Sequence, residues 1–483
     1  MTDTTTRTST EIATGPKHPV AILAVILLSY FMILLDNSVI FTALPSLQRD
    51  LGLTTIELTW VQDAYTLVFG GLLLLGARAG DLLGRRRVFI AGLAVFTLAS
   101  LLIGIATSGP WIIAARALQG VGAAIVAPAA LSLLTASFPA GPQRARAIAL
   151  YSATAGIGAS LGLLVGGAAA ELLTWRAGFF LNVPIGIAMI ALAPRFLPQQ
   201  RAARGRFDIV GALSATLGVG AIVFGIIHST EGGWADPLTI AALAAGALLL
   251  VVLVVTESRV TQPIMPLHLF SSRLRSGAYA ARFLYLGSMI GFFFFLTQYM
   301  QGELGFSPLE AGIGFLPMTI VNFAVAMALP PIARRIGETI PLVVGVAATL
   351  AGMTWLSVLD PAAGYLWGIG APMVLIGIGQ GLAFGPLTSA GVAGTSAADA
   401  GAASGLVNTF HQLGMALGLG ILVAVAHGAA SAGADLAGEV SAALAAGSGL
   451  LALCLIVCLA CIVPAAAIAR RASHTRAPAR ITR

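Results

Sequence analysis

The sequence predicts an all-α polytopic membrane protein with fourteen transmembrane helices and both termini in the cytoplasm. A helix that crosses a bilayer needs about 20 mainly apolar residues, and stretches of this kind fill most of the 483-residue chain. Hydrophobic residues make up 58% of the chain and charged residues only 9%. Because backbone groups in hydrocarbon must bond within their own segment, each stretch is expected to be a helix.

The predicted spans follow one another closely, and no gap between them is long enough to hold a soluble domain. The longest gap, near 257–277, is a basic segment. The fourteen spans lie near residues 20–45, 59–77, 88–107, 111–134, 147–170, 178–197, 209–228, 238–256, 278–301, 311–330, 340–358, 365–390, 401–426 and 447–469.

The distribution of basic residues predicts the orientation of the chain. All but four of the 26 Lys and Arg residues lie in the tails or in every second gap. Cytoplasmic loops are enriched in these residues, so both termini are predicted to be cytoplasmic, and a missed or invented span would destroy the pattern. The net charge of +7 is spread over short hairpins. It therefore indicates topology, and we expect no nucleic-acid partner.

Weak internal similarity predicts two matching halves. A basic hairpin occurs at 80–87 and again at 333–338, and glycines at four-residue spacing recur in the fifth and thirteenth spans. Duplicated six-helix halves are a transporter plan in which the binding site lies between the halves. The predicted organisation is a cytoplasmic tail at 1–19, a six-helix bundle at 20–197, two linker helices with basic loops at 198–277, a six-helix bundle at 278–469 and a basic tail at 470–483.

The hairpin after the second span is the first candidate functional motif. Its central residues are Gly80, Asp81, Gly84, Arg85 and Arg86. We expect the glycines to allow a tight turn, the acid to accept hydrogen bonds from a neighbouring helix N-terminus, and the arginines to reach carboxylates or lipid phosphates. Such a hairpin is predicted to hold the cytoplasmic side closed. The alternative is a basic loop that serves topology alone.

The second motif places a permanent charge within the membrane. Arg116 lies inside the fourth span, with Gln119 three residues later. An arginine side chain stays protonated, so at membrane depth it needs a partner or water. Asp36 is the only acid well inside the first span and is the expected partner. Burial favours the neutral acid and a nearby guanidinium favours the carboxylate, a balance that suits a proton carrier. The alternative for Arg116 is extension to the membrane interface.

The third motif is a glycine groove in the fifth span, formed by Gly158, Gly162, Gly166 and Gly167. Glycines one turn apart let another helix pack backbone to backbone. Further polar residues are predicted to line a substrate cavity: Asn37, Asp63, Tyr65, Gln119, Gln298, Gln301, Asn408 and His411. For Asp63 simple solvation near the outer surface is an equal alternative. For His411 a hydrogen-bonding wall residue is favoured over a titrating group.

Together these segments resemble the major facilitator superfamily, and within it the fourteen-helix drug:proton antiporter family. The resemblance runs from about Ser29 to Val425 and includes the hairpin, the Arg-x-x-Gln-Gly pattern of the fourth span and the Ala-Leu-Pro sequence that ends at Pro45. It implies the major facilitator fold and proton-coupled export of lipophilic drugs, antibiotics or a natural product by alternating access. One departure is Leu163, which stands where the antiporter motif of the family has proline.

Other functions remain in competition. Leu163 keeps open a facilitator, or an importer of a small metabolite, with the same fold. A membrane enzyme would need nucleophile–base pairs or metal ligands at membrane depth, which the scattered histidines do not supply. We expect no enzyme activity and no cofactor, with protons as the coupling ion because no P-loop is present. The expected partners are a small lipophilic substrate and membrane lipids, for a functional monomer in the bacterial inner (cytoplasmic) membrane.

Two further expectations concern charge. Arg282 is placed near the cytoplasmic start of the ninth span, where extension of its side chain to the interface is the default. Acids are scarce in the spans, with Asp36 and Asp63 the candidates. Because a second unpaired charge in a cavity is costly, neutral or singly cationic compounds are expected to be preferred to dications.

Overall fold

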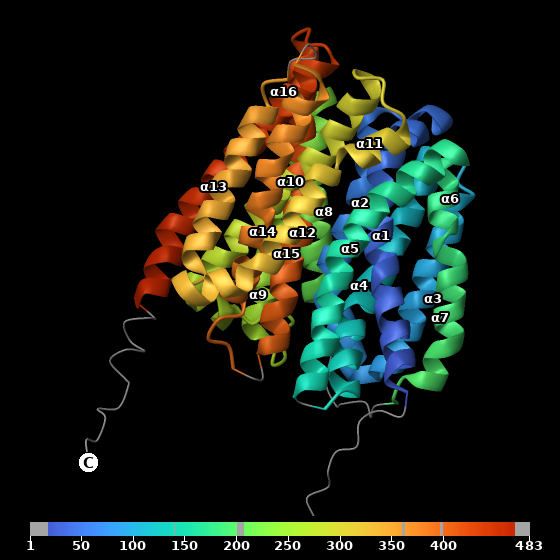
Figure 1. Ribbon diagram of the computed structural model, residues 1–483, viewed down its shortest axis with the longest axis vertical. Coiled ribbons are helices and arrows are strands. Elements are labelled where there is room, and N and C mark those ends of the chain that lie inside the picture. The colour runs from blue at the N-terminus through green and yellow to red at the C-terminus, as the bar shows by residue number, and fades with distance from the viewer. Residues whose placement is uncertain (1–17, 140, 200–206, 360–362, 397–398, 469–483) are drawn as a thin grey trace, which may run out of the picture.

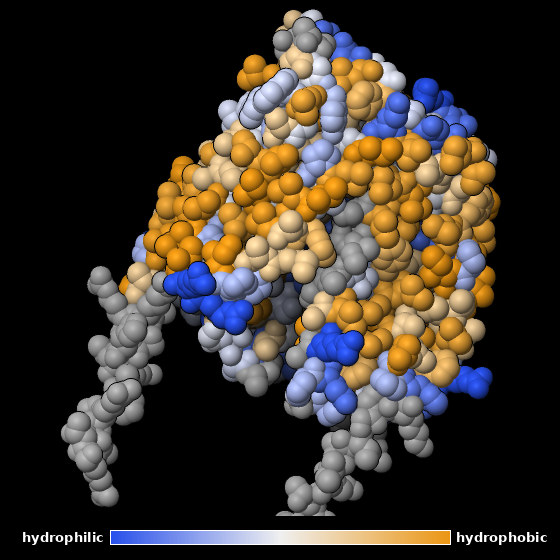
Figure 2. All heavy atoms as spheres, viewed as in Figure 1, coloured by the Kyte–Doolittle hydropathy of each residue, from blue (hydrophilic) through white to orange (hydrophobic). Residues whose placement is uncertain are grey.

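The computed structural model describes residues 18–139, 141–199, 207–359, 363–396 and 399–468. The predicted N-terminal tail up to residue 17, residues 200–206 of the predicted linker region and the whole predicted C-terminal tail lie outside these ranges. Secondary structure in the described residues is helical, with no strand. Thirteen helices of the described part are long and apolar enough to cross a membrane. Figure 2 shows a broad apolar band around the middle of the molecule, with hydrophilic residues toward its two ends. The fold is thus an all-helical membrane bundle.

The first seven helices pack into one group, which we call the N-group. They are α1 (Pro19–Leu51), α2 (Thr55–Leu83), α3 (Arg85–Gly104), α4 (Gly109–Ser137), α5 (Pro142–Leu172), α6 (Trp175–Phe180) and α7 (Asn182–Phe196). A capping box begins α2: the Thr54 side chain accepts from the Glu57 backbone N–H at 3.1 Å, and the Glu57 carboxylate accepts from the Thr54 backbone N–H at 2.9 Å. Such reciprocal bonds satisfy two free donors and fix where a helix starts.

The last helices form a second group, the C-group. They are α10 (Arg273–Gly302), α11 (Pro308–Gly314), α12 (Leu316–Ile336), α13 (Thr339–Leu356), η3 (Leu366–Gly370), α14 (Ala371–Gly391), α15 (Ala400–Ser431), α16 (Leu436–Val457) and η4 (Cys458–Ile462). A second capping box, Ser307 with Glu310, starts α11. The chain then turns at Phe315, so one predicted span is divided into α11 and α12.

Between the groups in the chain lie α8 (Ile209–Gly232) and α9 (Pro237–Arg259), joined to the C-group through the short helix η1 (Leu267–Ser271). The two long helices pack on each other, and α8 also contacts α2 and α15. In contrast, α9 presents its apolar side chains outward: Leu248 is 64% exposed and Val251 59%. In a membrane protein, such a surface faces lipid tails.

The N-group and C-group contact each other along α2 and α15, and they also meet at one end of the molecule, which we call the α11 end. There the Gln301 side chain of α10 donates to the Thr42 carbonyl of α1 at 3.0 Å. The rings of Phe41 and Phe293 stack with centroids 5.3 Å apart. In Figure 1, α11 lies at the top, beside the end of α5. The opposite end, where α2 and α3 meet at Gly84, is the hairpin end. On the face seen in Figure 2 the surface is hollowed toward that end.

Candidate functional site

A buried ion pair joins α1 and α4 in the interior of the N-group. One guanidinium nitrogen of Arg116 lies 2.8 Å from a carboxylate oxygen of Asp36, and both side chains have 0% exposure. The structure therefore pairs the two residues, and Arg116 does not extend to the interface. Taking two charges out of water is costly, and the pair is stable only if its remaining donors and acceptors are also bonded.

Neighbouring residues supply most of those bonds, and Nη2 of Arg116 has no partner in the described structure. Gln119, one turn after Arg116, accepts from the guanidinium at 2.7 Å and donates to Asp36 at 2.8 Å. The same amide lies 2.9 Å from the hydroxyl of Ser100 on α3. Asn182, at the start of α7, donates to Asp36 at 2.8 Å. Asp36 thus accepts hydrogen bonds from two helices of the N-group, and a change in its protonation alters contacts with both.

The guanidinium of Arg116 is held from α2 as well. Its Nε donates to the carbonyl of Val61 at 3.1 Å, and its carbon lies 4.3 Å from the centre of the Tyr65 ring. Such a cation–π contact contributes about 0.5–2 kcal/mol. Close approach of α4 depends on Gly120, where an added Cβ atom would lie 2.7 Å from the Tyr65 carbonyl. The polar cluster therefore spans α1, α2, α3, α4 and α7.

Asp63 is not part of this cluster. It is 0% exposed, so the alternative of simple solvation is wrong. Neither of its carboxylate oxygens has a hydrogen-bond partner among the described residues. Asn37 is half-buried, and its side-chain oxygen is likewise without a partner in the described structure. The hydroxyl of Tyr65 also lacks a partner there, so three of the predicted cavity residues retain polar atoms that a substrate or water can bond.

The remaining predicted cavity residues divide between two places. Gln301 bonds α1 at the α11 end, and Gln298 donates to the Phe294 carbonyl of its own helix at 3.1 Å. Asn408 and His411 lie one turn apart on α15, and Asn408 is exposed. The predicted set therefore forms no single cluster: one part surrounds Asp36, another closes the α11 end, and a third lies in the C-group.

Arg282 joins the third part, contrary to the expectation that it reaches the interface. It is only 6% exposed, and its guanidinium lies 3.1 Å from Nδ1 of His411 and 4.2 Å from the centre of the Phe384 ring. The helix starts at Arg273, more than two turns earlier, so Arg282 is deeper than the sequence suggested. Its position inside a predicted span, like that of Arg116, was the signal in the sequence that could have revealed this depth.

The glycine groove of α5 packs against α1 of the same group. An added Cβ at Gly162 would lie 2.5 Å from the Cβ of Ser38, and one at Gly166 would lie 2.7 Å from the Cα of Val39. Gly158 makes a similar approach to α1. Gly167 differs, since its added Cβ would lie 2.5 Å from the Pro308 carbonyl of α11 in the other group. Three glycines therefore fix α5 on α1, and the fourth joins the N-group to the C-group.

The hairpin differs in two respects from the expectation. Gly84 has φ +95° and makes the turn, whereas Gly80 lies inside α2, so the turn depends on one glycine. Asp81 accepts from Arg85 at 3.1 and 3.2 Å instead of from a helix N-terminus. Arg86 donates to the Pro194 and Leu197 carbonyls of the α7 segment, each at 3.1 Å. These hairpin contacts lie within the N-group.

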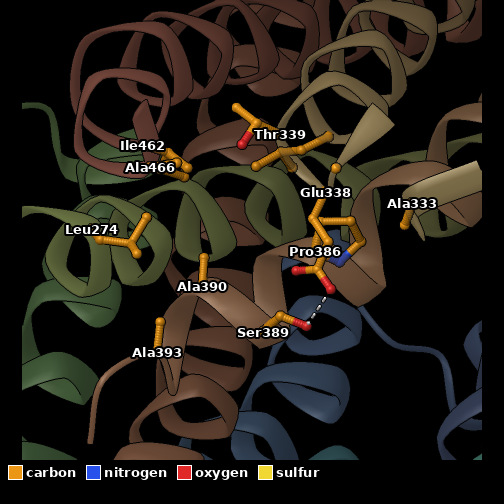
Figure 3. A pocket seen from close by; sticks show the side chains of 12 residues that line it. Leu274, Ala333, Glu338, Thr339, Pro386, Ser389, Ala390, Ala393, Ile462 and Ala466 are labelled. Carbon is orange, nitrogen blue, oxygen red and sulfur yellow. Dashed lines mark hydrogen bonds between the residues drawn. The ribbon is translucent and has the colours of Figure 1, made fainter. Parts of the chain in front are cut away.

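A separate cavity of 360 Å³ lies at the hairpin end of the C-group (Figure 3). The dashed line in Figure 3 marks a hydrogen bond from the Ser389 hydroxyl to the Glu338 carboxylate, at 3.4 Å. The rest of the lining is mainly apolar, and none of the predicted site residues takes part. In the described structure no three His, Cys, Asp or Glu residues lie together as a metal site requires.

Comparisons with known proteins agree with this architecture. The family described as Major Facilitator Superfamily matches residues 26–419. The cephamycin export protein CmcT of Amycolatopsis lactamdurans is 43% identical over 415 residues, covering 85% of each chain. The puromycin resistance protein pur8 of Streptomyces alboniger is 41% identical and covers 85% of this chain and 82% of its own. Among solved structures, a peptide transporter, POT, has TM-score 0.68 at 14% identity, covering 94% of this chain and 95% of its own.

Proposed function

Because this chain belongs to the major facilitator superfamily, we propose that it is a proton-coupled efflux transporter of the bacterial cell membrane. It exports lipophilic drugs, antibiotics or a natural product by alternating access. Export and resistance are the activities named for its relatives, CmcT for cephamycin and pur8 for puromycin. The observation that carries the proposal is the fully buried pair of Asp36 and Arg116, because a carboxylate poised between a cation and a dry interior can bind and release a proton.

The proposed coupling uses the contacts of Asp36. The ionised carboxylate holds Arg116, Gln119 and Asn182 in one arrangement. Protonation removes the negative charge and weakens the bonds that Asp36 accepts from these donors. α1, α4 and α7 are then free to adopt a second arrangement. Since α1 also contacts α10, a shift of α1 changes the contact between the N-group and the C-group.

The proposed gate at the α11 end consists of contacts that must break when the transporter opens outward. One is the hydrogen bond from the Leu309 backbone N–H to the Glu171 carboxylate, at 3.0 Å. Another is the bond from Gln301 to α1. At the opposite end, the hairpin around Gly84 is proposed to close the cytoplasmic side in the outward-open state. The hollow toward the hairpin end supports an inward-open arrangement for the present structure.

The proposed topology has fourteen spans in a six-plus-two-plus-six order with cytoplasmic termini. The thirteen helices that are long and apolar enough support it, and α5, with 31 residues, supplies the length for one more. Basic residues concentrated in alternate gaps support the orientation. In this topology α8 and α9 are the two linker helices. The protein is proposed to act as a monomer without a cofactor, in contact with lipid and its substrate.

The energy for export is proposed to come from the proton gradient. One charge that crosses 100 mV gains about 2.3 kcal/mol, which is enough for about fiftyfold accumulation at equilibrium. The alternative is a facilitator or importer, favoured by Leu163, which is buried on α5 where the carbonyl closely approaches Gly312 of α11. Efflux from loaded cells, measured before and after a protonophore collapses the gradient, separates the two. After the gradient collapses, a proton-coupled exporter no longer moves the substrate outward against its concentration gradient, whereas a facilitator still lets the substrate flow down that gradient.

A further inference from the structure

Arg282 is a buried cation that lacks a negative partner. Arg282 has an exposed fraction of only 6% and is thus 94% buried. None of the ion pairs among the described residues includes it. Acidic residues of the C-group in the described structure lie at or near helix ends: Glu303, Glu310, Glu338, Asp399, Asp435 and Glu439. A buried guanidinium without a counter-charge is unfavourable, so the site is incomplete.

The hydrogen bonds that Arg282 makes leave some of its N–H donors weakly bonded or without an acceptor. Its Nη1 reaches the Phe384 carbonyl at 3.4 Å and the Thr388 hydroxyl at 3.3 Å, both long for this type of bond. Its Nη2 faces Nδ1 of His411 at 3.1 Å, and its Nε has no partner among the described residues. These acceptors are all neutral. A carboxylate is the group that matches the planar fork of a guanidinium.

Arg282 lies on the face of α10 that looks toward the N-group. The same face carries Phe293, whose ring stacks on Phe41 of α1. Tyr30, also on α1, is within electrostatic range of Arg282, and its ring stacks on Tyr151 of α5 at 4.1 Å. The unpaired cation therefore lies on the side of the C-group that faces the N-group, where alternating access requires a transported compound to pass.

Aromatic surfaces surround this cation. Phe384 covers the guanidinium at 4.2 Å and contacts His411 edge-on. The stacked Tyr30 and Tyr151 rings add an apolar surface on the opposite group. With Nδ1 of His411 accepting a hydrogen bond, its ring carries a proton on Nε2 and has one more donor available. The combination suits a compound with a flat apolar body and one anionic group.

We propose that Arg282, assisted by His411, binds a carboxylate of the exported compound in the space between the N-group and the C-group. This inference rests on the proposed export function and narrows its substrate class to lipophilic monoanions. It revises the expectation that neutral or singly cationic compounds are preferred to dications, which was based on the scarcity of acids and took Arg282 to reach the interface. Here the exported compound itself supplies the missing negative charge.

A matched pair of probes tests the proposal directly. Dansyl-phenylalanine is a carboxylate, and its methyl ester has the same rings without the charge. Binding of each to the full-length protein in nanodiscs is measured by fluorescence anisotropy without a proton gradient. Charge-assisted hydrogen bonds predict at least about tenfold tighter binding of the acid by the wild type. Arg282→Gln is expected to weaken acid binding about tenfold and to leave ester binding unchanged.

Two further variants separate binding from folding. Arg282→Lys retains the charge and is expected to keep part of the acid preference, and His411→Asn is expected to reduce it by a smaller factor. Arg275→Gln is the matched control, since Arg275 is on the same helix and bonds the Leu269 and Ala393 carbonyls at 2.9 and 3.1 Å. It should bind both probes like the wild type.

Three results overturn the inference. In the first, the wild type does not bind the acid, or binds it no more tightly than the ester. In the others, Arg282→Gln loses binding of both probes equally, or Arg275→Gln loses as much acid binding as Arg282→Gln does. Transport of both probes from proteoliposomes with an imposed pH gradient is a separate measurement. Gradient-driven export of the ester without any acid preference leaves the export function standing and rejects the carboxylate site. Selective acid binding with no gradient-driven movement rejects proton-coupled export and retains the site.

Discussion

Asp36 of α1 and Arg116 of α4 form an ion pair of 2.8 Å in which neither side chain is exposed. Asp63 of α2 is equally buried, but neither of its carboxylate oxygens has a partner in the described structure. Two acids from neighbouring helices thus occupy opposite electrostatic environments within one bundle. This contrast leads to different expectations for the same substitution at the two positions.

The change to asparagine is expected to destabilise the protein at Asp36 but not at Asp63. Asp36→Asn leaves Arg116 buried without a counter-charge, a defect that costs about 3–5 kcal/mol. Asp63→Asn removes a buried group with no bonding partner and is expected to keep or raise the unfolding temperature. Thermal unfolding of the purified variants in one detergent at pH 8 checks both. Equal destabilisation by the two substitutions would contradict the assigned environments.

Arg116 is expected to be irreplaceable by lysine. Its Nη1 donates to Asp36 and Gln119 and its Nε to the Val61 carbonyl, in directions fixed by the planar guanidinium, whereas an ammonium is a single point charge. Arg116→Lys should therefore lose most efflux, by about tenfold or more for each charge-assisted bond that is not remade. Drug efflux from cells with equal membrane levels of each variant is the measurement. Full efflux by Arg116→Lys would show that the charge alone is sufficient.

A double variant in which both Asp36 and Arg116 are replaced by neutral amides provides a control for the single substitutions of this ion pair. Arg116→Gln leaves the Asp36 carboxylate unpaired, and adding Asp36→Asn removes that charge. Because a pair of neutral amides has no uncompensated ion, the double variant is expected to unfold at a higher temperature than Arg116→Gln alone. It should still be inactive in export, since it has no group to carry the proton. Lower stability of the double variant would mean that the two side chains do not interact.

The span pattern and the pairing of Asp36 with Arg116 were predictable, because hydropathy and a buried charge in need of a partner are local signals. Other features arise only when distant segments meet. Asn182 reaches Asp36 from α7, 146 residues later in the chain, and no spacing rule connects the two. The turn at Phe315, which divides one predicted span into α11 and α12, was missed for another reason: its local signal is Pro317 at the start of α12, within an otherwise apolar stretch.

Two errors have specific physical causes. Both hairpin glycines were expected to turn the chain, but only Gly84 takes a positive φ, because α2 continues through Gly80 to Leu83. Arg282 was expected to reach the interface because its span was started at residue 278. In the structure α10 begins at Arg273. That extension moves Arg282 deeper into the bundle, where its partners come from α14 and α15.

Gly162 is expected to tolerate no side chain. An added Cβ would lie 2.5 Å from the Cβ of Ser38 and 2.8 Å from the Leu35 carbonyl, so α1 and α5 must separate. Overpacking of this kind costs about 1–3 kcal/mol, and Gly162→Leu should abolish transport. Gly220→Leu on α8 is the matched control, because nothing lies within 4 Å of its added Cβ. Transport and thermal unfolding of both variants are compared. Wild-type transport by Gly162→Leu would contradict the close packing of α5 on α1.

Gly167 makes the equivalent close contact between the two groups, so its substitution should favour the state that is open at the α11 end. An added Cβ would lie 2.5 Å from the Pro308 carbonyl and 2.9 Å from the Cα of Leu309. In a background without native cysteines, Phe41→Cys reports on this end, because Phe41 is 4% exposed. Gly167→Val should increase its labelling by a membrane-impermeant maleimide several-fold. Unchanged labelling, with transport retained, would show that the contact is not part of a gate.

The central claim, that Asp36 carries the coupling proton, is tested most directly by transport in vesicles under an imposed pH gradient. Wild-type protein and Asp36→Asn are reconstituted at equal density, and gradient-driven movement of a lipophilic drug is followed with binding measured in parallel. The amide keeps the shape of the acid but cannot exchange a proton at this position. The proposal predicts gradient-driven transport by the wild type and none by Asp36→Asn, with drug binding still measurable. Gradient-driven transport by Asp36→Asn at the wild-type rate would contradict it.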